Sequence, residues 1–169
     1  MPIENVIPET LNADPSRAHL IDREHEVRQG VVSVILVNYK GAEDTIACLR
    51  YFDEIDWPTE RLELIVVEND SQDGSAELIA KACPTVRVLP SGANLGFAGG
   101  CNFGVEAATG EYVAFINNDA RPGKSWVRAA VEEMEDDPSV GAVASKVLDW
   151  DGKLVDFVDG SLTWYGMGY

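Results

Sequence analysis

Three polar residues, Asn117, Asn118 and Asp119, directly follow a short apolar run over 112–116. A run of this length and composition is typical of a buried strand, so the three side chains are expected where that strand ends. Carboxylate and carboxamide oxygens suit hard cations such as Mg²⁺ or Mn²⁺, which proteins often share with substrate phosphates. The pattern therefore predicts a metal–diphosphate site. The alternative is a simple turn before Pro122, because the same residue types dominate turns.

Polar clusters follow three other apolar runs in the same manner. They are Asn38-Tyr39-Lys40, the segment 68–71 and the glycine-rich segment 94–100. Ligands of open α/β sheets bind outside the carboxyl ends of the strands, where all four clusters would meet. There Tyr39 could stack on a base, and Glu68 could accept hydrogen bonds from a base or a ribose. A polar loop explains any one cluster alone, whereas four clusters at strand ends favour a nucleotide-binding edge.

The elements that must position these clusters alternate along the chain. Strands are expected over 31–37, 62–67, 86–89, 112–116 and 140–148, and helices over 46–52, 76–82, 97–108 and 123–135. In the third helix, Phe97, Cys101 and Val105 would form one apolar stripe, and Gly110 would close the helix. The alternation predicts an α/β fold with a mainly parallel sheet and helices on both faces. Asp151-Gly152, between two apolar pairs, predicts a β-hairpin.

Length, composition and charge set the broad class. A chain of 169 residues with 46% hydrophobic and 25% charged residues fits one globular domain. Its formal net charge of −16 would repel a phosphate backbone, so no nucleic-acid partner is expected. An anionic nucleotide could still bind where a cation and backbone N–H groups offset the repulsion. Residues 1–29 are interpreted as a polar N-terminal extension, and 30–169 as the domain.

Three cysteines, Cys48, Cys83 and Cys101, lie far apart and form no C-x-x-C pair. They are interpreted as reduced, mostly buried thiols, which favours a cytoplasmic location. The apolar run 31–37 is far shorter than a membrane span, so no transmembrane segment is predicted. Peripheral association with the inner face of the cell membrane stays open.

Four segments together resemble a known family. They are 32–40, 65–75, 94–102 and 115–122, and the similarity extends from residue 31 to about residue 150. In order and spacing they resemble the family 2 glycosyltransferases, especially the rhamnosyltransferase-like branch. The resemblance implies a GT-A fold with a Rossmann-like sheet, incomplete at its C-terminus. It also implies a nucleotide-diphosphate sugar donor and a divalent metal, Mg²⁺ or Mn²⁺.

The resemblance assigns roles to individual positions. Nucleotide-sugar contacts fall on Asn38, Tyr39, Glu68, Asp73, Asn94, Gly96, Asn102 and Asn118. Asp119 matches the last aspartate of the metal-binding D-x-D motif, and Asn117 replaces the first. Glu68 stands where the family usually has the aspartate that reads the base.

One expected feature of the family is absent. The general base commonly lies within a Glu-Asp pair further along the chain. The acidic residues after Asp119 lie in the helix expected over 123–135 and directly after it, near the hairpin, or at Asp156 and Asp159, and none is interpreted as that pair. The catalytic residue is therefore unknown and expected beyond Tyr169. The chain is interpreted as the donor-binding part of a longer enzyme, or a natural remnant of one. Trp164, Tyr165 and Tyr169 near the end suggest an uncovered apolar surface and self-association.

The leading hypothesis is an inverting, metal-assisted transfer of a sugar to a hydroxyl of a glycan or lipid-linked acceptor, in cell-envelope or polysaccharide synthesis. The alternative is a nucleotide-sugar-binding module without turnover. A sugar-phosphate nucleotidyltransferase would need a Gly- and Arg-rich loop after the first strand, which the residues after Asn38 do not provide. Dinucleotide-binding and P-loop proteins are poorer matches, because neither glycine motif occurs.

Overall fold

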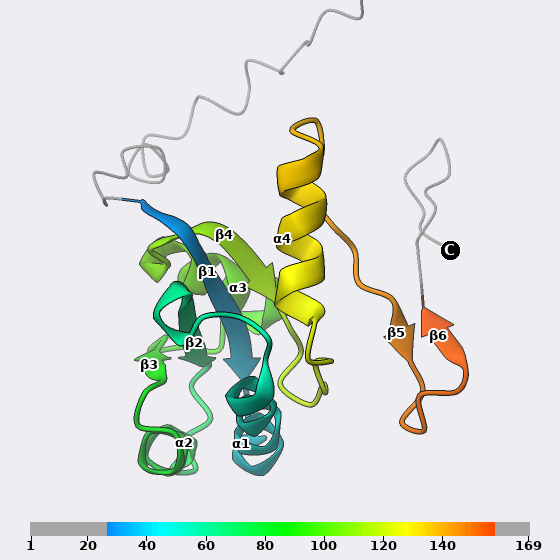
Figure 1. The fold of residues 1–169 in the computed structure, drawn as a ribbon. Helices are drawn as coiled ribbons and strands as arrows, with labels where there is room; N and C mark the ends of the chain where they lie inside the picture. Colours follow the sequence, from blue (N-terminus) through cyan, green and yellow to red (C-terminus); the bar gives the residue numbers. More distant parts are fainter. Residues whose placement is uncertain (1–26, 158–169) are drawn as a thin grey trace, which may run out of the picture.

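The computed structural model describes residues 27–157 (Figure 1). Its centre is a four-stranded parallel sheet with the order β3-β2-β1-β4. The strands are β1 (Arg28–Asn38), β2 (Leu62–Glu68), β3 (Arg87–Pro90) and β4 (Gly110–Phe115). Most of the expected extension over 1–29 and the aromatic end after residue 160 lie outside the described residues.

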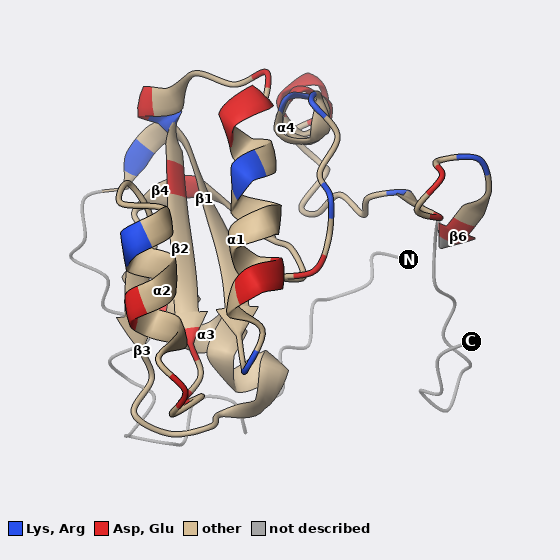
Figure 2. Ribbon diagram, turned by 90° about the horizontal axis from the view of Figure 1, so that it is seen from below, with Lys and Arg blue, Asp and Glu red and all other residues tan. Residues whose placement is uncertain are grey.

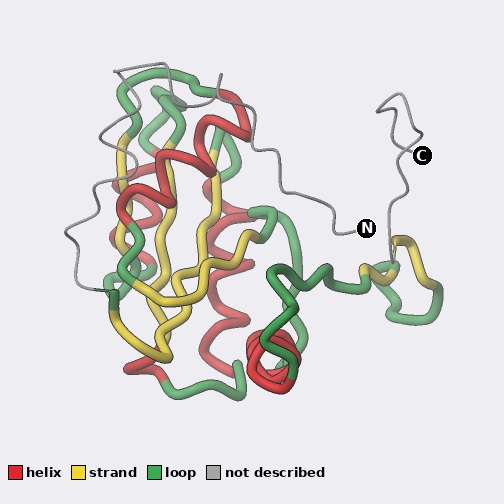
Figure 3. The backbone as a smooth tube through the Cα atoms, turned by 90° about the horizontal axis from the view of Figure 1, so that it is seen from above, coloured by secondary structure: helices red, strands yellow, loops and turns green. Residues whose placement is uncertain are grey.

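Helices cover both faces of the sheet, as Figure 3 shows. They are α1 (Ala42–Arg50), α2 (Ser75–Ala82), α3 (Gly96–Ala107) and α4 (Trp126–Asp136), with short 3₁₀ turns η3 (Tyr51–Glu54) and η4 (Thr59–Arg61). None of the helices in the described part is long and apolar enough to cross a membrane. The expected α/β architecture with a parallel sheet is confirmed.

The central strand β1 explains why both faces need helices. Alternate side chains of a strand point to opposite faces. Val34 and Leu36 pack in the cluster that includes α1, α2 and α4, whereas Ile35 and Val37 pack with residues of α3. All four are buried. A strand apolar on both sides is stable only when both sides are covered.

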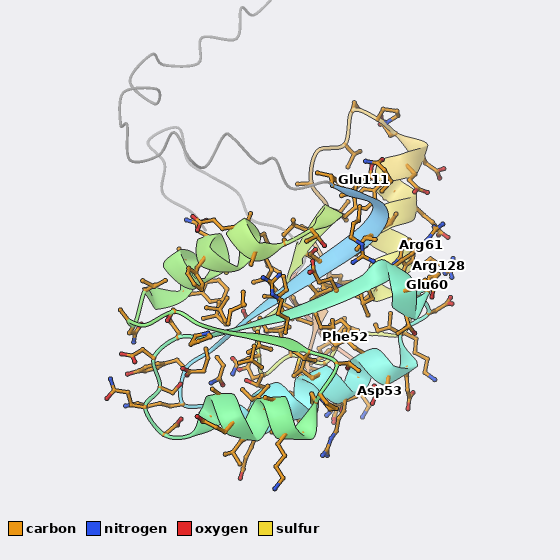
Figure 4. All side chains as sticks on the ribbon, turned by 90° about the vertical axis from the view of Figure 1, so that its left-hand side faces the viewer. Phe52, Asp53, Glu60, Arg61, Glu111 and Arg128 are labelled. Atoms are coloured by element: carbon orange, nitrogen blue, oxygen red, sulfur yellow. The ribbon has the colours of Figure 1, made fainter. Side chains whose placement is uncertain are left out.

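The first cluster also anchors the end of α1. Phe52 of η3 is buried and lies edge-on to Trp126 of α4, with ring centroids 6.2 Å apart. Figure 4 labels Phe52 in the interior, whereas Glu60, Arg61 and Arg128 lie at the periphery. The aromatic contact therefore joins the α1 side of the layer to α4.

Helix α3 approaches the sheet closely because it carries glycines. A Cβ at Gly104 would lie 2.6 Å from Ile35 Cγ2, and one at Gly100 would lie 2.9 Å from Val37 Cγ1. Phe97, about one turn before Gly100, is 59% exposed, so its expected place in the apolar stripe was wrong. Gly110 does not close this helix, which ends at Ala107; it starts β4 instead.

The expected strand over 140–148 was also wrong in most of its length. Only Val147–Leu148 forms a strand, β5, and it pairs antiparallel with β6 (Val155–Phe157) in a separate ribbon. Gly141, Ala142, Ala144 and Ser145 offer too little apolar surface to hold a buried strand. The hairpin around Asp151-Gly152 is confirmed, with Gly152 in the left-handed region (φ +68°). Figure 1 shows this hairpin set apart from the main sheet.

Candidate functional site

The carboxyl ends of the four parallel strands lie along one edge of the sheet. Asn38 at the end of β1 is paired with Glu68 at the end of β2, and Glu68 with Pro90 at the end of β3. Backbone hydrogen bonds continue across the edge, because Asn69 N donates to Asn38 O at 2.8 Å and Ser91 N donates to Glu68 O at 2.9 Å. The expectation that the polar clusters share this edge is confirmed.

A buried hydrogen-bond network links the first and last of these clusters. Asn38 is 0% exposed, and its Oδ1 accepts from Thr45 Oγ1 at 2.8 Å. Asn118 Nδ2 donates in turn to the same Thr45 oxygen at 3.1 Å. A Cβ at Gly41 would lie 2.9 Å from Asn118 Nδ2, so this approach requires a glycine at the start of α1. The loop after β4 is thereby held against the loop after β1.

The same asparagine reaches the loop after β2. Asn38 Nδ2 donates to Ser71 Oγ at 3.4 Å, and Lys40 N donates to the same oxygen at 2.9 Å. Glu68 is 7% exposed, and its Oε1 accepts from Ser71 N at 2.9 Å. Asn38 and Glu68 therefore lie behind the loops and position them, instead of forming an open pocket wall.

Asn69 links the loops after β2 and β3, although it was not among the residues assigned to the site from the sequence. It is 2% exposed. Its Oδ1 accepts from Leu95 N at 2.9 Å, and its Nδ2 donates to Asn94 Oδ1 at 3.1 Å. Its place between Glu68 and Ser71 was the available signal, but its partners lie about 25 residues away in sequence and follow only from the fold.

Three non-glycine residues in these loops have positive φ. They are Lys40 (58°), Asp70 (61°) and Gln72 (55°). Such conformations are unfavourable for side-chain-bearing residues and cluster at functional sites, where surrounding contacts impose them. Here the network through Asn38, Ser71 and Glu68 supplies those contacts. The polar network therefore maintains a loop shape that the chain would not adopt alone.

Other assigned residues stand in front of this network. Tyr39 is 45% exposed, with Lys40 Nζ 5.1 Å from its ring centroid. Asn94 and Gly96 are exposed at the start of α3, where Asn94 Oδ1 accepts from Gly96 N at 2.9 Å. Asn102 is exposed farther along α3. The exposed ring and backbone at the edge are available to a ligand.

Asp73 is exposed and lies just before the start of α2. Its Oδ1 accepts from Ser75 N at 3.0 Å, in the manner of a helix cap. The side-chain hydrogen bond from Ser75 holds the pKa of the Asp73 carboxyl below its usual value. Its local role is thus to begin the helix, and its assigned contact with a nucleotide sugar stays a prediction.

Asp119 and Asn117 are both exposed after β4. Burial, together with the nearby Asp119 charge, raises the pKa of the Cys48 thiol to about 12. No three His, Cys, Asp or Glu side chains gather into a metal cluster within residues 27–157. A single carboxylate and a carboxamide still fit Mg²⁺ or Mn²⁺, because these ions commonly bind one or two carboxylates and take further ligands from substrate phosphates and water.

Outside the loop network, acidic and basic residues are interspersed on the surface. Figure 2 shows basic and acidic segments interspersed over α1 and α2. Among the described residues the exposed ion pairs, such as Arg128 with Asp56 at 2.8 Å, lie away from the loop network. The edge itself therefore relies on amides, hydroxyls, backbone groups and the buried Glu68 carboxylate, and Asp119 is exposed after β4.

Known proteins match this chain over most of the described part. The sequence model of the family described as "Glycosyl transferase family 2" matches residues 33–154. "Glycosyltransferase AglE" of Haloferax volcanii is 31% identical over 103 residues, which cover 59% of this chain and 34% of that protein. An N-acetylglucosaminyl-diphospho-decaprenol L-rhamnosyltransferase of Mycobacterium tuberculosis is 26% identical over 117 residues, covering 62% and 38% of the two chains.

Solved structures agree on the fold. The mannosyltransferase PcManGT from Pyrobaculum calidifontis, in complex with GDP-Man and Mn²⁺, has a TM-score of 0.60 and 27% identity, covering 73% of this chain and 39% of its own. S. aureus TarS in complex with UDP has a TM-score of 0.56 and 25% identity, covering 63% and 32%. The GT-A fold is thus confirmed.

This chain spans only about a third of the length of the curated relatives it matches. The family match nevertheless includes the ends of all four parallel strands, and with them the polar loops described above. This chain therefore belongs to glycosyl transferase family 2.

Proposed function

We propose that this chain binds a nucleotide-diphosphate sugar and belongs to an enzyme that transfers the sugar to an acceptor hydroxyl. The observation that carries the proposal is the buried network of Asn38, Thr45, Asn118 and Asn69, which holds loops from all four strand ends around one edge. Relatives named as glycosyltransferases and neighbours solved with GDP-Man or UDP support it.

Each exposed group has a part in donor binding. Tyr39 offers a ring on which a base can stack. Backbone groups around Gly96, where φ is 68° and no Cβ intervenes, can approach the diphosphate closely. Glu68, which is buried and whose Oε1 accepts from Ser71 N, acts by fixing the loop beside the ligand, and its direct contact with the nucleoside stays a prediction.

Asp119 and Asn117 would hold a divalent cation. When bound, this ion stabilises negative charge that develops on the diphosphate leaving group. Asp119 is suited to the task because its carboxylate is exposed just after the end of β4. Asn117 contributes a neutral oxygen, so the pair binds the ion more weakly than two carboxylates would.

The transfer step itself is proposed to proceed with inversion. The acceptor hydroxyl attacks the anomeric carbon as the bond to the diphosphate breaks, and a general base takes the hydroxyl proton. No residue of the described part is assigned as that base. The acceptor is proposed to be a glycan or lipid-linked sugar of cell-envelope or polysaccharide synthesis.

The wider setting belongs to the same proposal. Residues 30–169 form the nucleotide-sugar-binding part, preceded by the extension 1–29. The three free cysteines favour a reducing compartment, so we place the protein in the cytoplasm, with peripheral contact at the membrane face. Self-association is expected, and sedimentation velocity over a range of concentrations tests it.

Calorimetric titration with UDP, GDP and dTDP sugars tests donor binding, with Mn²⁺ or with a chelator. We expect tighter binding with Mn²⁺, and Asp119→Ala should remove that difference because it deletes the charged ligand. Asp136→Ala is the matched control, since it removes an exposed carboxylate at the far end of α4. Equal binding with and without chelator would contradict the metal role.

Absence of binding to every nucleotide sugar would overturn the donor-binding proposal as a whole. The alternative of a module without turnover is separated by a second measurement. The complete protein should transfer sugar to an acceptor, whereas a binding module would bind the donor with the same metal dependence and transfer none.

A further inference from the structure

Thr45 lies at the centre of the hydrogen-bond network of the carboxyl edge. It belongs to α1, which begins just after the end of β1 (Figure 1). Its side chain is 0% exposed. The hydroxyl forms hydrogen bonds with residues at the ends of two different strands, Asn38 after β1 and Asn118 after β4. Thr45 is therefore the point at which the loops after these strands are joined.

The hydroxyl proton of Thr45 has two acceptors within reach, and one of them depends on it. Thr45 Oγ1 lies 2.8 Å from Asn38 Oδ1 and 2.9 Å from Gly41 O. A hydroxyl has a single proton to donate. Gly41 O already accepts from Thr45 N at 2.9 Å, whereas Asn38 Oδ1 accepts from no other donor within residues 27–157. We therefore assign the proton to the hydrogen bond with Asn38.

The oxygen of the same hydroxyl is also an acceptor. Asn118 Nδ2 donates to it at 3.1 Å. The hydrogen bonds thus run in one direction, from Asn118 to Thr45 and from Thr45 to Asn38. Asn38 Nδ2 continues the series by donating to Ser71 Oγ in the loop after β2, at 3.4 Å. Hydrogen bonds arranged in such a series polarise and strengthen one another.

Burial leaves the members of this series without substitute partners. Asn38 and Ser71 are both buried, so water does not replace a hydrogen bond that is lost there. An amide also has a fixed donor end and a fixed acceptor end, so Asn38 cannot turn without losing both contacts. A shift of the loop after β4 that removes Asn118 weakens the hold on Asn38, and a shift of Asn38 weakens the hold on Asn118.

The two loops carry groups for different parts of the proposed ligand. The loop after β1 carries Tyr39, the proposed platform for the base, and the loop after β4 carries the proposed ligands of the cation. Lys40, next to Tyr39, has positive φ (58°), and its N donates to Ser71 Oγ at 2.9 Å. The last acceptor of the series therefore also fixes the shape of the loop that presents Tyr39.

We propose that Thr45 is a positioning residue that couples the two loops energetically. A nucleoside that orders the loop after β1 raises the affinity for a divalent cation at the loop after β4. The cation raises the affinity for the nucleoside by the same factor, because such coupling is reciprocal. The identity of the two ligands rests on the function proposed above, whereas the coupling of the loops through Thr45 depends only on the hydrogen bonds.

Nucleosides without phosphate separate this coupling from direct contact between a diphosphate and the cation. Saturation-transfer NMR on the 169-residue chain measures the affinity for uridine, guanosine and thymidine, with and without Mg²⁺. We expect Mg²⁺ to strengthen the binding of at least one nucleoside about fivefold, the lower end of typical coupling between sites. Thr45→Val, which replaces the hydroxyl by a methyl group, should abolish this effect. Thr45→Ser, which keeps the hydroxyl, should restore most of it.

Ser33→Ala is the matched control. Ser33 is also 0% exposed, but its hydroxyl donates to Glu63 at the opposite edge of the sheet. A simple loss of stability would appear in both variants, whereas the effect of Mg²⁺ should change only in Thr45→Val. The coupling is overturned if Mg²⁺ acts equally on the wild type and Thr45→Val. It is also overturned if the wild type binds a nucleoside and Mg²⁺ has no effect on that binding.

Amide hydrogen exchange tests the coupling without any ligand. The reporters are Lys40 N, which donates to Ser71 Oγ, and Ala120 N, which donates to Asn117 O at 3.0 Å. We expect Thr45→Val to raise both exchange rates about tenfold through local opening, and Ser33→Ala to raise neither more than those of β1. Exchange that rises in only one loop, or in neither, overturns the coupling. A chain in which both loops respond but no nucleoside binds refutes the proposed donor site alone.

Discussion

The two edges of the sheet both contain buried polar networks, but the networks differ in kind. At the amino edge one carboxylate collects the hydrogen bonds: Glu63 Oε2 accepts from Ser33 Oγ at 2.5 Å and from Thr109 N at 2.9 Å. Arg87 Nη1 lies 3.8 Å from Glu63 Oε1. At the carboxyl edge, amides and hydroxyls connect four loops through Asn38 and Asn69, and the Glu68 carboxylate contributes one hydrogen bond, from Ser71 N.

The difference separates stability from binding. The Glu63 network ties Ser33 of β1 and Thr109, the residue before β4, to β2, so its hydrogen bonds fix the sheet itself. The carboxyl-edge network holds Lys40 and Asp70 at positive φ, so part of its energy maintains an unfavourable loop shape. We infer that the amino edge chiefly stabilises the fold, whereas the carboxyl edge chiefly shapes a site.

Glu63→Ala should give the largest loss of stability. Deleting the carboxylate leaves Ser33 Oγ and Thr109 N without their partner in a site where Glu63 is only 15% exposed. Unpaired buried donors cost about 1–3 kcal/mol each, and we expect the unfolding free energy to fall by about 2–3 kcal/mol. Urea denaturation measures this loss, and calorimetry should show nucleotide affinity unchanged.

Glu111→Ala is the matched control for that variant. Glu111 is an exposed carboxylate at the same edge and, within residues 27–157, accepts one hydrogen bond, from Gly30 N at 2.7 Å. Figure 4 labels it near the start of β1. Its loss should cost about 0.5–1 kcal/mol. A Glu63→Ala protein as stable as the control would remove the distinction between the two edges.

Asn69→Ala should have the opposite effect, a loss of nucleotide affinity with a smaller loss of stability than in Glu63→Ala. The change removes the acceptor of Leu95 N and the donor to Asn94, so the segment at the start of α3 loses its attachment to β2. We expect about tenfold weaker nucleotide binding but a stability loss of only about 1–2 kcal/mol. Gln72→Asn, an exposed change in the same loop, should leave affinity unaltered. Equal affinity in Asn69→Ala and the wild type would show that this network serves stability alone.

The strands of this fold were predictable because their apolar residues are consecutive and β-branched. The runs 31–37 and 62–67 lie within β1 and β2, and only the entry of β1 at Arg28, which pairs with Gly110 across a register shift, gave no apolar signal. The strand expected over 140–148 was wrong because alternating small residues resemble a strand pattern without supplying core.

The location of the site was predictable from the sequence, but the hydrogen bonds within it were not. Strand ends located the polar clusters at one edge, since parallel strands share their direction. Whether a polar residue faces a ligand or its neighbours depends on distant partners. Asn38 is buried because Thr45 and Ser71 approach it. The local sequence of the strand indicates neither contact.

The smallest expected effect is a pH dependence of stability that arises from Cys48. The pKa of its thiol responds to the charge at the carboxyl edge. Burial first, and the Asp119 charge second, raise the pKa of its thiol from 9.0 to about 12. A group whose pKa is raised in the folded state favours folding fully below its unfolded value and loses that contribution as the pH rises toward the folded value. Between pH 9 and 12 the unfolded chain gains thiolate while the folded chain cannot.

Wild-type stability should therefore fall faster than that of Cys48→Ala as the pH rises above 9. We expect an excess loss of about 1 kcal/mol by pH 10, measured by urea denaturation at a series of pH values. Lys and Tyr titrate in the same range in both proteins, so the difference between the two curves isolates the thiol. Asp119→Asn should reduce this excess slightly, because one charge that opposes the thiolate is gone, whereas Glu63→Ala at the opposite edge should leave it intact. If Glu63→Ala changed the excess as much as Asp119→Asn, the two edges would not be electrostatically separate, and the division between a stabilising edge and a binding edge would fail.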